Sequence, residues 1–393
     1  MNTLSPADTK VIDAPISSLH IPQLDGIRGI AILLVVIFHY FAKSIDPHAN
    51  LLTEYAAKLA DLTWSGVDLF FVLSGFLIGG ILLDHRKAPN YFQSFYARRI
   101  ARIFPLYFAY LVAFLIVGTI MLVFWASPPM IALFGSPFSP LAYITYTQNI
   151  QMAMENRWGP AWLSVTWSLA VEEQFYLLLP FIIRLVKPRW IPRLLVTLIL
   201  LSPVWRIVQW LASNVIFANY VLLFARMDAL FFGVLCAYLM RRSFTKNLIQ
   251  THRRALYTLM FILAFSLAFL PTHLAPEDHS VEMNTYGYSL LALLYACFLL
   301  IAITEQRGLV SKLTQNPLLR QLGILAYGIY LFHDPVNRLA HAMLLNQTPH
   351  LQTVADILVT LLSFTITLAL AYFSWHTFEK KFVARGHAIQ YKK

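Results

Sequence analysis

The sequence predicts an all-α, polytopic integral membrane protein, and two bulk properties support this. Of its 393 residues, 58% are hydrophobic and only 12% are charged, whereas soluble domains carry about 25% charged residues. The apolar residues also gather in runs of about twenty, the length with which an α-helix crosses a hydrocarbon core about 30 Å thick. About ten such spans are predicted, near 27–45, 65–83, 104–125, 164–186, 192–212, 222–240, 255–271, 285–304, 322–341 and 354–375.

The distribution of basic residues predicts the orientation. The formal net charge is +11, and of the 30 Lys and Arg residues 24 fall in the tails and in every second connection, 4 on the opposite side and 2 inside spans. Because Lys and Arg accumulate in cytoplasmic loops, both termini are expected in the cytoplasm. The charge is therefore explained by topology and by contact with anionic lipid, and not by a nucleic-acid partner. This organisation gives a cytoplasmic tail (1–22), a transmembrane domain (23–376) and a basic cytoplasmic tail (377–393).

The first span, LDGIRGIAILLVVIFHY, places His39 eleven residues after Arg28. That spacing is about 16.5 Å along a helix, so Arg28 can lie at one membrane face with His39 near the middle. Ionisable groups at such depth are costly and usually functional. A neutral histidine that exchanges a proton near pH 7 is a candidate catalyst. The alternative is a packing histidine that hydrogen-bonds to a neighbouring helix.

The next two spans add polar groups at two depths. The second span contains Asp68 near its outer end and Ser74 in its middle, and the string YARRIARIFPLY before the third contains Arg98, Arg99 and Arg102. Arginines three and four apart share a helix face. Paired guanidinium groups suit a multiply phosphorylated ligand, although the basic flank of a membrane helix gives the same pattern. Ser74 is a candidate nucleophile relay, but small residues at such places more often allow close helix packing.

Two cytoplasmic termini require an even number of spans. The segment 126–163 is therefore predicted to be an outer loop or a re-entrant segment. The loop 272–284 is predicted to lie on the same outer side. Aromatic residues such as Trp158, Trp162 and Tyr146 are expected at a membrane interface.

Three later spans bring further polar groups to a similar depth. The fourth contains Glu172, the sixth contains Arg226 and Asp228, and the ninth, YGIYLFHDP, contains Tyr330 and His333. So many polar spans in one bundle would be unfavourable unless the groups pair or line a wet cavity, so a functional cavity is predicted. Glu173 lies about 100° round the helix from Glu172, so only one of the two should face it. No spacing typical of a metal site occurs, and no metal is expected.

Six of these strings, in this order, resemble the acyltransferase-3 family of membrane O-acyltransferases. They run from residue 24 to about 335, so the resemblance covers most of the chain. They are LDGIRG with Arg28-x10-His39, GVDLFFVLSGFLI, Arg99-x-x-Arg102-Ile-x-Pro105, WSLAVEEQFYLL, Arg226-x-Asp228…Gly233 and YGIYLFHDP.

The resemblance implies an activity: transfer of an acyl group, usually acetyl, from cytoplasmic acyl-CoA (acetyl-CoA) to a hydroxyl of an extracytoplasmic carbohydrate. O-antigen, peptidoglycan and exopolysaccharide are acceptors within the family, and acylation of a small molecule such as a macrolide is an alternative. The cell inner (plasma) membrane is the location that this implies. Acceptor specificity is then expected in the outer loops 126–163 and 272–284, where Trp158, Trp162 and Tyr146 could stack on sugar faces. Many members carry a fused SGNH domain, and none occurs in this sequence, so the chain resembles the stand-alone branch.

The resemblance also implies roles for individual residues. His39 is the expected general base, oriented by Glu172 or an aspartate, although a covalent acyl-His39 intermediate stays open. Arg99 and Arg102 are expected to bind the phosphates of coenzyme A, while Arg28 either joins them or holds Asp25. The remaining motif positions are expected to support the site; they are Asp68, Ser74, Arg226, Asp228, Tyr330 and His333.

A proton-coupled transporter is the main alternative from another class. Acids and histidines near the midplane of a membrane also form proton relays. Against it, the sequence contains no matched pair of Gly- or Pro-broken helices in two halves, which is the usual indication of a transport site.

Overall fold

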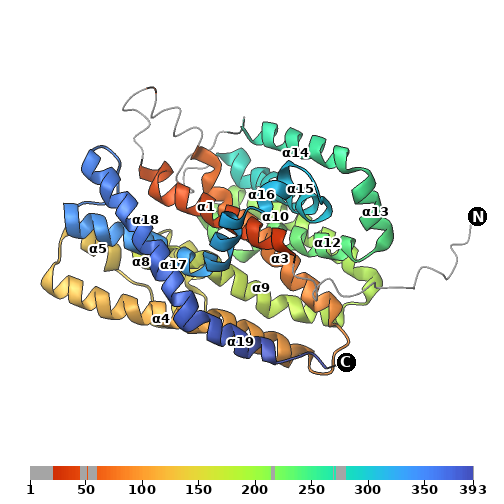
Figure 1. The fold of residues 1–393 in the computed structure, drawn as a ribbon, viewed down its shortest axis with the longest axis horizontal. Coiled ribbons are helices and arrows are strands. Elements are labelled where there is room, and N and C mark those ends of the chain that lie inside the picture. The colour runs from red at the N-terminus through yellow and green to blue at the C-terminus, as the bar shows by residue number, and fades with distance from the viewer. Residues whose placement is uncertain are drawn as a thin grey trace, which may run out of the picture.

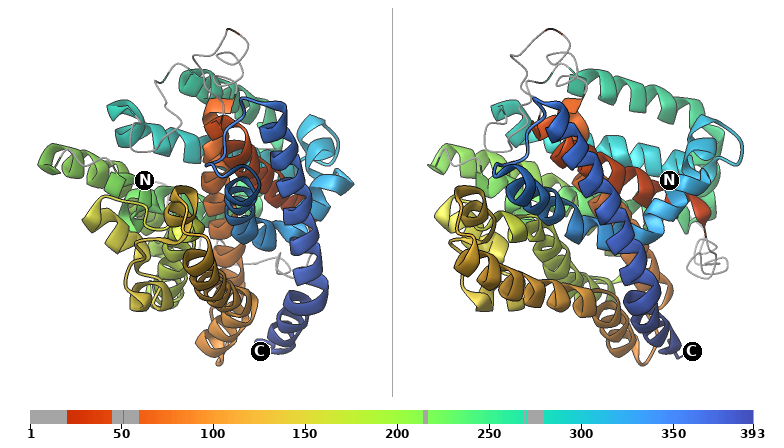
Figure 2. Two further views of the ribbon diagram at one scale, coloured as in Figure 1. Left: turned by 90° about the vertical axis from the view of Figure 1, so that its left-hand side faces the viewer. Right: turned by 60° about the vertical axis from the view of Figure 1, so that its left-hand side comes forward.

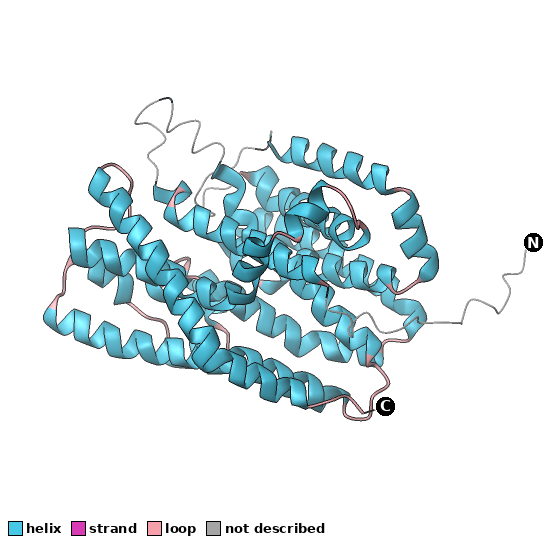
Figure 3. Ribbon diagram, in the orientation of Figure 1, coloured by secondary structure: helices cyan, strands magenta, loops and turns pink. Residues whose placement is uncertain are grey.

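The computed structural model describes residues 21–44, 51, 60–213, 217–268, 270 and 280–392. Within these residues the chain is helical and contains no strand (Figure 3). Most of the predicted N-terminal tail and most of the predicted loop 272–284 lie outside the described residues.

Each of the ten predicted spans corresponds to a helix. These helices are α1 (Pro22–Tyr40), α3 (Gly66–Asp84), α4 (Tyr91–Phe124), α9 (Thr166–Leu185), α10 (Ile191–Ser213), α12 (Leu223–Met240), α14 (Arg253–Ala268), α15 (Tyr288–Thr304), α17 (Pro317–Leu345) and α18 (Val354–Ser374).

Seven segments in the described residues are long and apolar enough to cross a membrane, and the protein is a multi-pass membrane protein. They are 22–44, 62–84, 91–124, 188–212, 217–240, 283–304 and 354–388. The predicted spans outside this set are α14, which has only 16 residues, and two helices with polar residues in their middle, EEQ in α9 and HDP in α17. The same polar residues that lower the hydropathy of α9 and α17 include Glu172 and His333.

The segment 126–163 folds into four short helices, α5 (Pro128–Phe134), α6 (Pro140–Ile144), α7 (Gln148–Glu155) and α8 (Ala161–Ser164). The longest has eight residues and is about 12 Å long, too short to cross a hydrocarbon core. The segment therefore adds no pair of spanning helices. The other short elements are η3 (Ala42–Ser44), η4 (Asp61–Ser65), η5 (Pro188–Trp190), α11 (Phe217–Val221), α13 (Ser243–Thr251), η7 (Met283–Gly287), α16 (Leu309–Thr314), η8 (Trp375–Glu379) and α19 (Lys380–Ala388).

Helices α1 and α17 run side by side through the middle of the bundle (Figures 1 and 2). A Cβ atom on Gly29 would lie 1.8 Å from the carbonyl oxygen of Leu319, and one on Gly323 would lie 1.8 Å from that of Asp25. Only glycine permits such an approach of two backbones, and membrane helices use small residues in this way. Further along, the Tyr40 hydroxyl donates to the carbonyl oxygen of His333 at 2.8 Å. These contacts set the depth of α1 against that of α17.

Two buried ion pairs connect α3, α10 and α12. Arg206 of α10 pairs with Asp228 of α12 at 3.0 Å, and Arg226 of α12 pairs with Asp68 of α3 at 2.5 Å, with all four side chains at most 1% exposed. The guanidinium carbon of Arg226 also lies 4.0 Å from the centre of the Tyr288 ring. Three residues from the predicted functional set, Asp68, Arg226 and Asp228, are therefore bonded between helices.

Candidate active site

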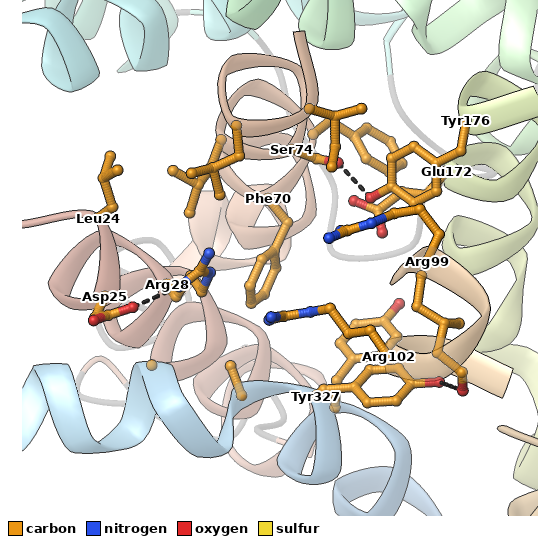
Figure 4. Close-up of a pocket in the computed structure, with 18 of the residues that line it drawn as sticks. Leu24, Asp25, Arg28, Phe70, Ser74, Arg99, Arg102, Glu172, Tyr176 and Tyr327 are labelled. Atoms are coloured by element: carbon orange, nitrogen blue, oxygen red, sulfur yellow. Dashed lines mark hydrogen bonds and ion pairs between the residues drawn. The ribbon is translucent and has the colours of Figure 1, made fainter. Parts of the chain in front are cut away.

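A cavity with a volume of about 670 Å³ lies between α1, α3, α4, α9 and α17 (Figure 4). Its lining follows α3 from Val67 to His85, a distance of about 27 Å along the helix. Basic side chains dominate its polar lining, so we refer to it as the basic cavity. They are Arg28, His85, Arg98, Arg99, Arg102 and His387.

The arginines reach this cavity from two helices. Arg99 and Arg102 extend from α4, and Arg28 extends from α1 on the facing wall (Figure 4). Their spacing predicted that the α4 arginines share one helix face, and this prediction is confirmed. Arg28 also forms an ion pair of 2.5 Å with Asp25, so both functions considered for it are available in one position. Clustered guanidinium groups at a concave surface attract an anion with several charges.

One face of α9 supplies a carboxyl group and two hydroxyl groups to the basic cavity. Ser168, Glu172 and Tyr176 are four residues apart and all line it, as one face of an α-helix requires. The Tyr176 hydroxyl lies 2.6 Å from that of Ser74 on α3, and Glu172 lies beside both (Figure 4). Glu173 does not line the cavity, which confirms that only one glutamate of the pair faces it.

The second cavity has a volume of about 180 Å³ and is lined largely by aromatic side chains, so we refer to it as the aromatic cavity. His39 opens into it. Tyr330 and Val67 line both cavities and form a common wall between them. The Tyr330 hydroxyl lies 2.8 Å from the carbonyl oxygen of Val165 and 2.5 Å from the Ser168 hydroxyl, which holds the ring in this wall. The other polar and aromatic lining residues are Phe38, Lys43, Trp64, Trp158, Ser164, Trp167, Tyr220, Asp334 and Arg338.

His39 and His333 contact each other behind the aromatic cavity. The Nδ1 atom of His333 lies 2.7 Å from the carbonyl oxygen of Tyr330 and must carry a proton to bond there. In the neutral ring its Nε2 is then an acceptor, and it lies 3.3 Å from Nδ1 of His39. That Nδ1 also lies 3.0 Å from the carbonyl oxygen of Val35. With two acceptors facing it, Nδ1 of His39 carries the proton.

The remaining nitrogen of His39, Nε2, is therefore unprotonated in the neutral ring. No described residue bonds to it, and the side chain lines the aromatic cavity. An imidazole held by its Nδ1–H, with Nε2 as a free lone pair, is the arrangement of a general base. His333 contacts Nδ1 of His39. Of the partners expected from the sequence, Glu172 lines the other cavity, whereas an aspartate, Asp334, lines the same cavity as His39. Within the described residues, no group of three or more His, Cys, Asp or Glu could hold a metal ion.

The aromatic residues singled out in 126–163 separate into two kinds. Trp158 lines the aromatic cavity. Trp162 and Tyr146 are buried, against Phe134 with ring centres 5.1 Å apart and against Tyr107 at 4.5 Å. Those two therefore belong to the core, and only Trp158 can face a ligand.

Several lining residues were missed from the sequence. Tyr176 follows Glu172 by four residues, and Asp334 and Arg338, which form an ion pair of 2.8 Å, follow Tyr330 by four and eight residues on α17, so helical spacing could have found all three. His85 and His387 lie at the ends of segments far apart in the chain, and no pattern in the sequence relates them.

Comparisons with known proteins identify the family. The acyltransferase-3 family model, described as an acyltransferase domain, matches residues 21–376. The chain is 26% identical over 369 residues to the peptidoglycan O-acetyltransferase OatA of Listeria monocytogenes, covering 88% of this chain and 55% of that protein. It is 28% identical over 386 residues to "Putative peptidoglycan O-acetyltransferase YrhL" of Bacillus subtilis, covering 93% and 55%.

A third relative is a "Putative O-acetyltransferase" of Staphylococcus aureus strain COL, 25% identical over 395 residues, covering 93% of this chain and 58% of that protein. The chain thus spans little more than half the length of these relatives. No solved structure matches it. Because the family model covers nearly the whole chain, including both cavities and most of the residues that line them, this protein belongs to the acyltransferase-3 family.

Proposed function

We propose that this protein transfers an acetyl group from cytoplasmic acetyl-CoA to a hydroxyl of an extracytoplasmic cell-envelope glycan, within the cell inner membrane. The observation that carries the proposal is the pair of cavities with a common wall at Tyr330 and Val67. One is lined by four arginines, and the other contains His39 with Nε2 available. The names of the relatives, which include a peptidoglycan O-acetyltransferase, support a glycan acceptor.

The basic cavity is the proposed donor site. Acyl-coenzyme A is an elongated molecule with phosphates at one end and a thioester at the other, which suits a long cavity that is basic along part of its length. Arg99 and Arg102, with Arg28 opposite, are the proposed ligands of the phosphates. The thioester would then extend toward the Tyr330 wall. The predicted orientation places the basic end in the cytoplasm, where the donor is made, so the cofactor need not cross the membrane.

The aromatic cavity is the proposed acceptor site. Flat aromatic faces such as that of Trp158 suit the apolar face of a sugar ring, and the Asp334–Arg338 pair offers polar partners for its hydroxyls. Its volume of about 180 Å³ restricts the site to roughly one sugar residue of a longer glycan.

The proposed reaction uses His39 as the general base. The acceptor hydroxyl oxygen attacks the thioester carbonyl carbon while its proton passes to Nε2 of His39. The new C–O bond forms, the C–S bond breaks, and the imidazolium returns the proton to the departing thiolate. His333 accepts from Nδ1–H throughout and keeps the ring in one orientation. Asp334, which lines the same cavity, favours the transient positive charge on His39.

The test uses full-length protein in nanodiscs, with binding and hydrolysis of acetyl-CoA as readouts. His39→Ala should bind acetyl-CoA normally and lose turnover by about 10²–10⁴-fold. Arg99→Ala should weaken binding by about 10- to 100-fold, because a charge-assisted bond to phosphate is lost. The matched controls are His376→Ala, an exposed histidine that lines neither cavity, and Arg193→Ala, exposed over Trp190. Both controls should behave as wild type.

Two results would contradict the proposal. If the wild type binds no acyl-coenzyme A, the donor site is wrong, and the buried histidines are better explained as a proton pathway. If His39→Ala turns over as wild type, another group removes the proton. Accumulation of an acylated protein that depends on His39 would instead replace direct transfer with a covalent acyl-histidine step at the same residue.

A further inference from the structure

The C-terminal segment 386–392 packs against the beginning of α4 (Figure 1). Its His387 lines the basic cavity. Arg98 donates from Nε to the carbonyl oxygen of Ile389 at 2.7 Å. Asn90 donates to the carbonyl oxygen of Gln390 at 2.9 Å and accepts from the backbone N–H of Lys392 at 2.8 Å. The family match ends at residue 376. This docked segment is therefore a feature of the chain outside the matched domain.

Tyr391 connects three parts of the molecule at this place. Its ring stacks on that of His85, at the end of α3, with centres 4.0 Å apart and planes at 22°. The guanidinium carbon of Arg98 lies 4.9 Å from the centre of the same ring. Burial raises the pKa of the Tyr391 phenol, so the ring brings no negative charge to these cations. His85 and Arg98 both line the basic cavity, so Tyr391 holds two of its lining residues.

His387 is the residue by which the segment lines the cavity. It lies among Arg98, Arg99 and Arg102, and α19, with the sequence KKFVARGHA, contains no acidic residue. Two carboxylates, Glu172 and Glu379, interact with these arginines but do not outnumber them, and Asp25 is already paired with Arg28. Docking a basic segment against three arginines is unfavourable unless an anion lies between them.

We propose that the C-terminal segment is part of the donor site, with His387 as a ligand of a phosphate at the nucleotide end of the donor. Tyr391 acts as a positioning residue, because it holds Arg98 and His85 around the same phosphate. This inference rests on the proposed function. Along α3 the cavity runs from Val67, in the wall common to both cavities, to His85. The thioester and the nucleotide thus occupy opposite ends.

The experiment compares two donors on the full chain in nanodiscs made only of phosphatidylcholine, so that no anionic lipid headgroup is present. Acetyl-CoA carries the phosphates, and S-acetylpantetheine lacks them. His387→Ala should lower kcat/KM for acetyl-CoA about tenfold, as loss of a charge-assisted bond predicts, and leave kcat/KM for S-acetylpantetheine unchanged. The matched control is His376→Ala, an exposed histidine earlier in the same C-terminal region that does not line the cavity.

Two variants of Tyr391 test the positioning role without removing the phosphate ligand. Tyr391→Phe keeps the stack on His85 and should behave as wild type, because no described residue bonds to the Tyr391 hydroxyl. Tyr391→Ala should raise KM for acetyl-CoA severalfold with kcat preserved, since the change lies far from the thioester.

The inference is overturned if His387→Ala leaves acetyl-CoA kinetics unchanged, or if it affects both donors equally. It is also overturned if the defect occurs only in membranes that contain anionic lipid, because the segment would then bind the bilayer surface. Failure of the wild type to use either donor would overturn the proposed function instead, so the two failures are distinguishable.

Discussion

The two buried histidines differ in the nitrogens that they leave for chemistry. His333 donates from Nδ1 to a backbone carbonyl and accepts at Nε2 from His39, so both of its nitrogens are occupied by the protein. His39 has its Nδ1 occupied and its Nε2 available to the aromatic cavity. On this basis His39 is the proposed base and His333 a positioning residue.

The roles of the histidines predict different effects of substitution. His333→Ala should lower kcat by less than the about 10²–10⁴-fold expected for His39→Ala, because the base remains but its orientation is lost. His333→Gln should recover part of the activity, since its side-chain oxygen can accept from Nδ1–H of His39. The measurement is kcat and KM for acetyl transfer, with KM for acetyl-CoA unchanged in both variants. Equal loss in the alanine and glutamine variants would contradict the positioning role.

The buried ion pairs predict an effect on stability instead of catalysis. Asp68→Ala should destabilise the protein by about 3–5 kcal/mol, because Arg226 is left as an uncompensated buried charge. The double substitution Asp68→Leu with Arg226→Met should recover much of that loss. Thermal unfolding in one detergent measures both, with acetyl transfer per folded molecule as the second readout. Unfolding of Asp68→Ala at the wild-type temperature would show that the pair of 2.5 Å contributes little.

The contact between α1 and α17 determines whether the two histidines meet. His39 lies ten residues beyond Gly29 on α1, and His333 lies ten residues beyond Gly323 on α17. Both helices run in the same direction from the crossing. Close approach at Gly29 and Gly323, with the bond from Tyr40 to the His333 carbonyl beyond them, fixes the relative height of the two helices. A small shift along either axis would break the 3.3 Å contact between the imidazoles.

Gly29→Ala should therefore lower kcat although it lies far from the reacting atoms. Its Cβ would overlap the Leu319 carbonyl at 1.8 Å, so α1 must move away from α17. The matched control is Gly328→Ala on the opposite side of α17, where the new Cβ would lie 3.3 Å from Ala371 and little need move. We expect a lower kcat and a lower unfolding temperature for Gly29→Ala and neither change for the control. Wild-type kcat in a folded Gly29→Ala protein would mean that the crossing does not position the histidines.

The arrangement of the whole molecule brings a basic cavity and an aromatic cavity to one wall inside a membrane bundle. A proposed donor and a proposed acceptor can then react without either crossing the bilayer. That mechanism requires the basic end of α3 at His85 to face the cytoplasm. The mechanism also requires an even number of membrane crossings, because only an even number places both tails on the same side of the membrane.

The topology is tested by labelling single cysteines introduced into a variant in which Cys236 and Cys297 are replaced by alanine. Both native cysteines are buried. With a membrane-impermeant maleimide on intact cells, cysteine at Asn156 should label, while cysteine at Lys392 or at position 2 should label only after lysis. An odd number of crossings, such as the seven most apolar segments alone would give, would place the two tails on opposite sides and expose one of them.

The hydropathy of this chain was enough to predict an all-helical membrane protein and helices at all ten places, because apolar length is a local property of the sequence. The shared face of the α4 arginines and the equal depth of His39 and His333 were likewise predictable from helical periodicity. Long-range packing decided the rest. It assigned Glu172 to one cavity and His39 to the other, committed Asp68, Arg226 and Asp228 to ion pairs, and brought His387 to His85 across about three hundred residues. Contacts of that kind depend on which helices cross and at what height, and a one-dimensional pattern does not contain that information.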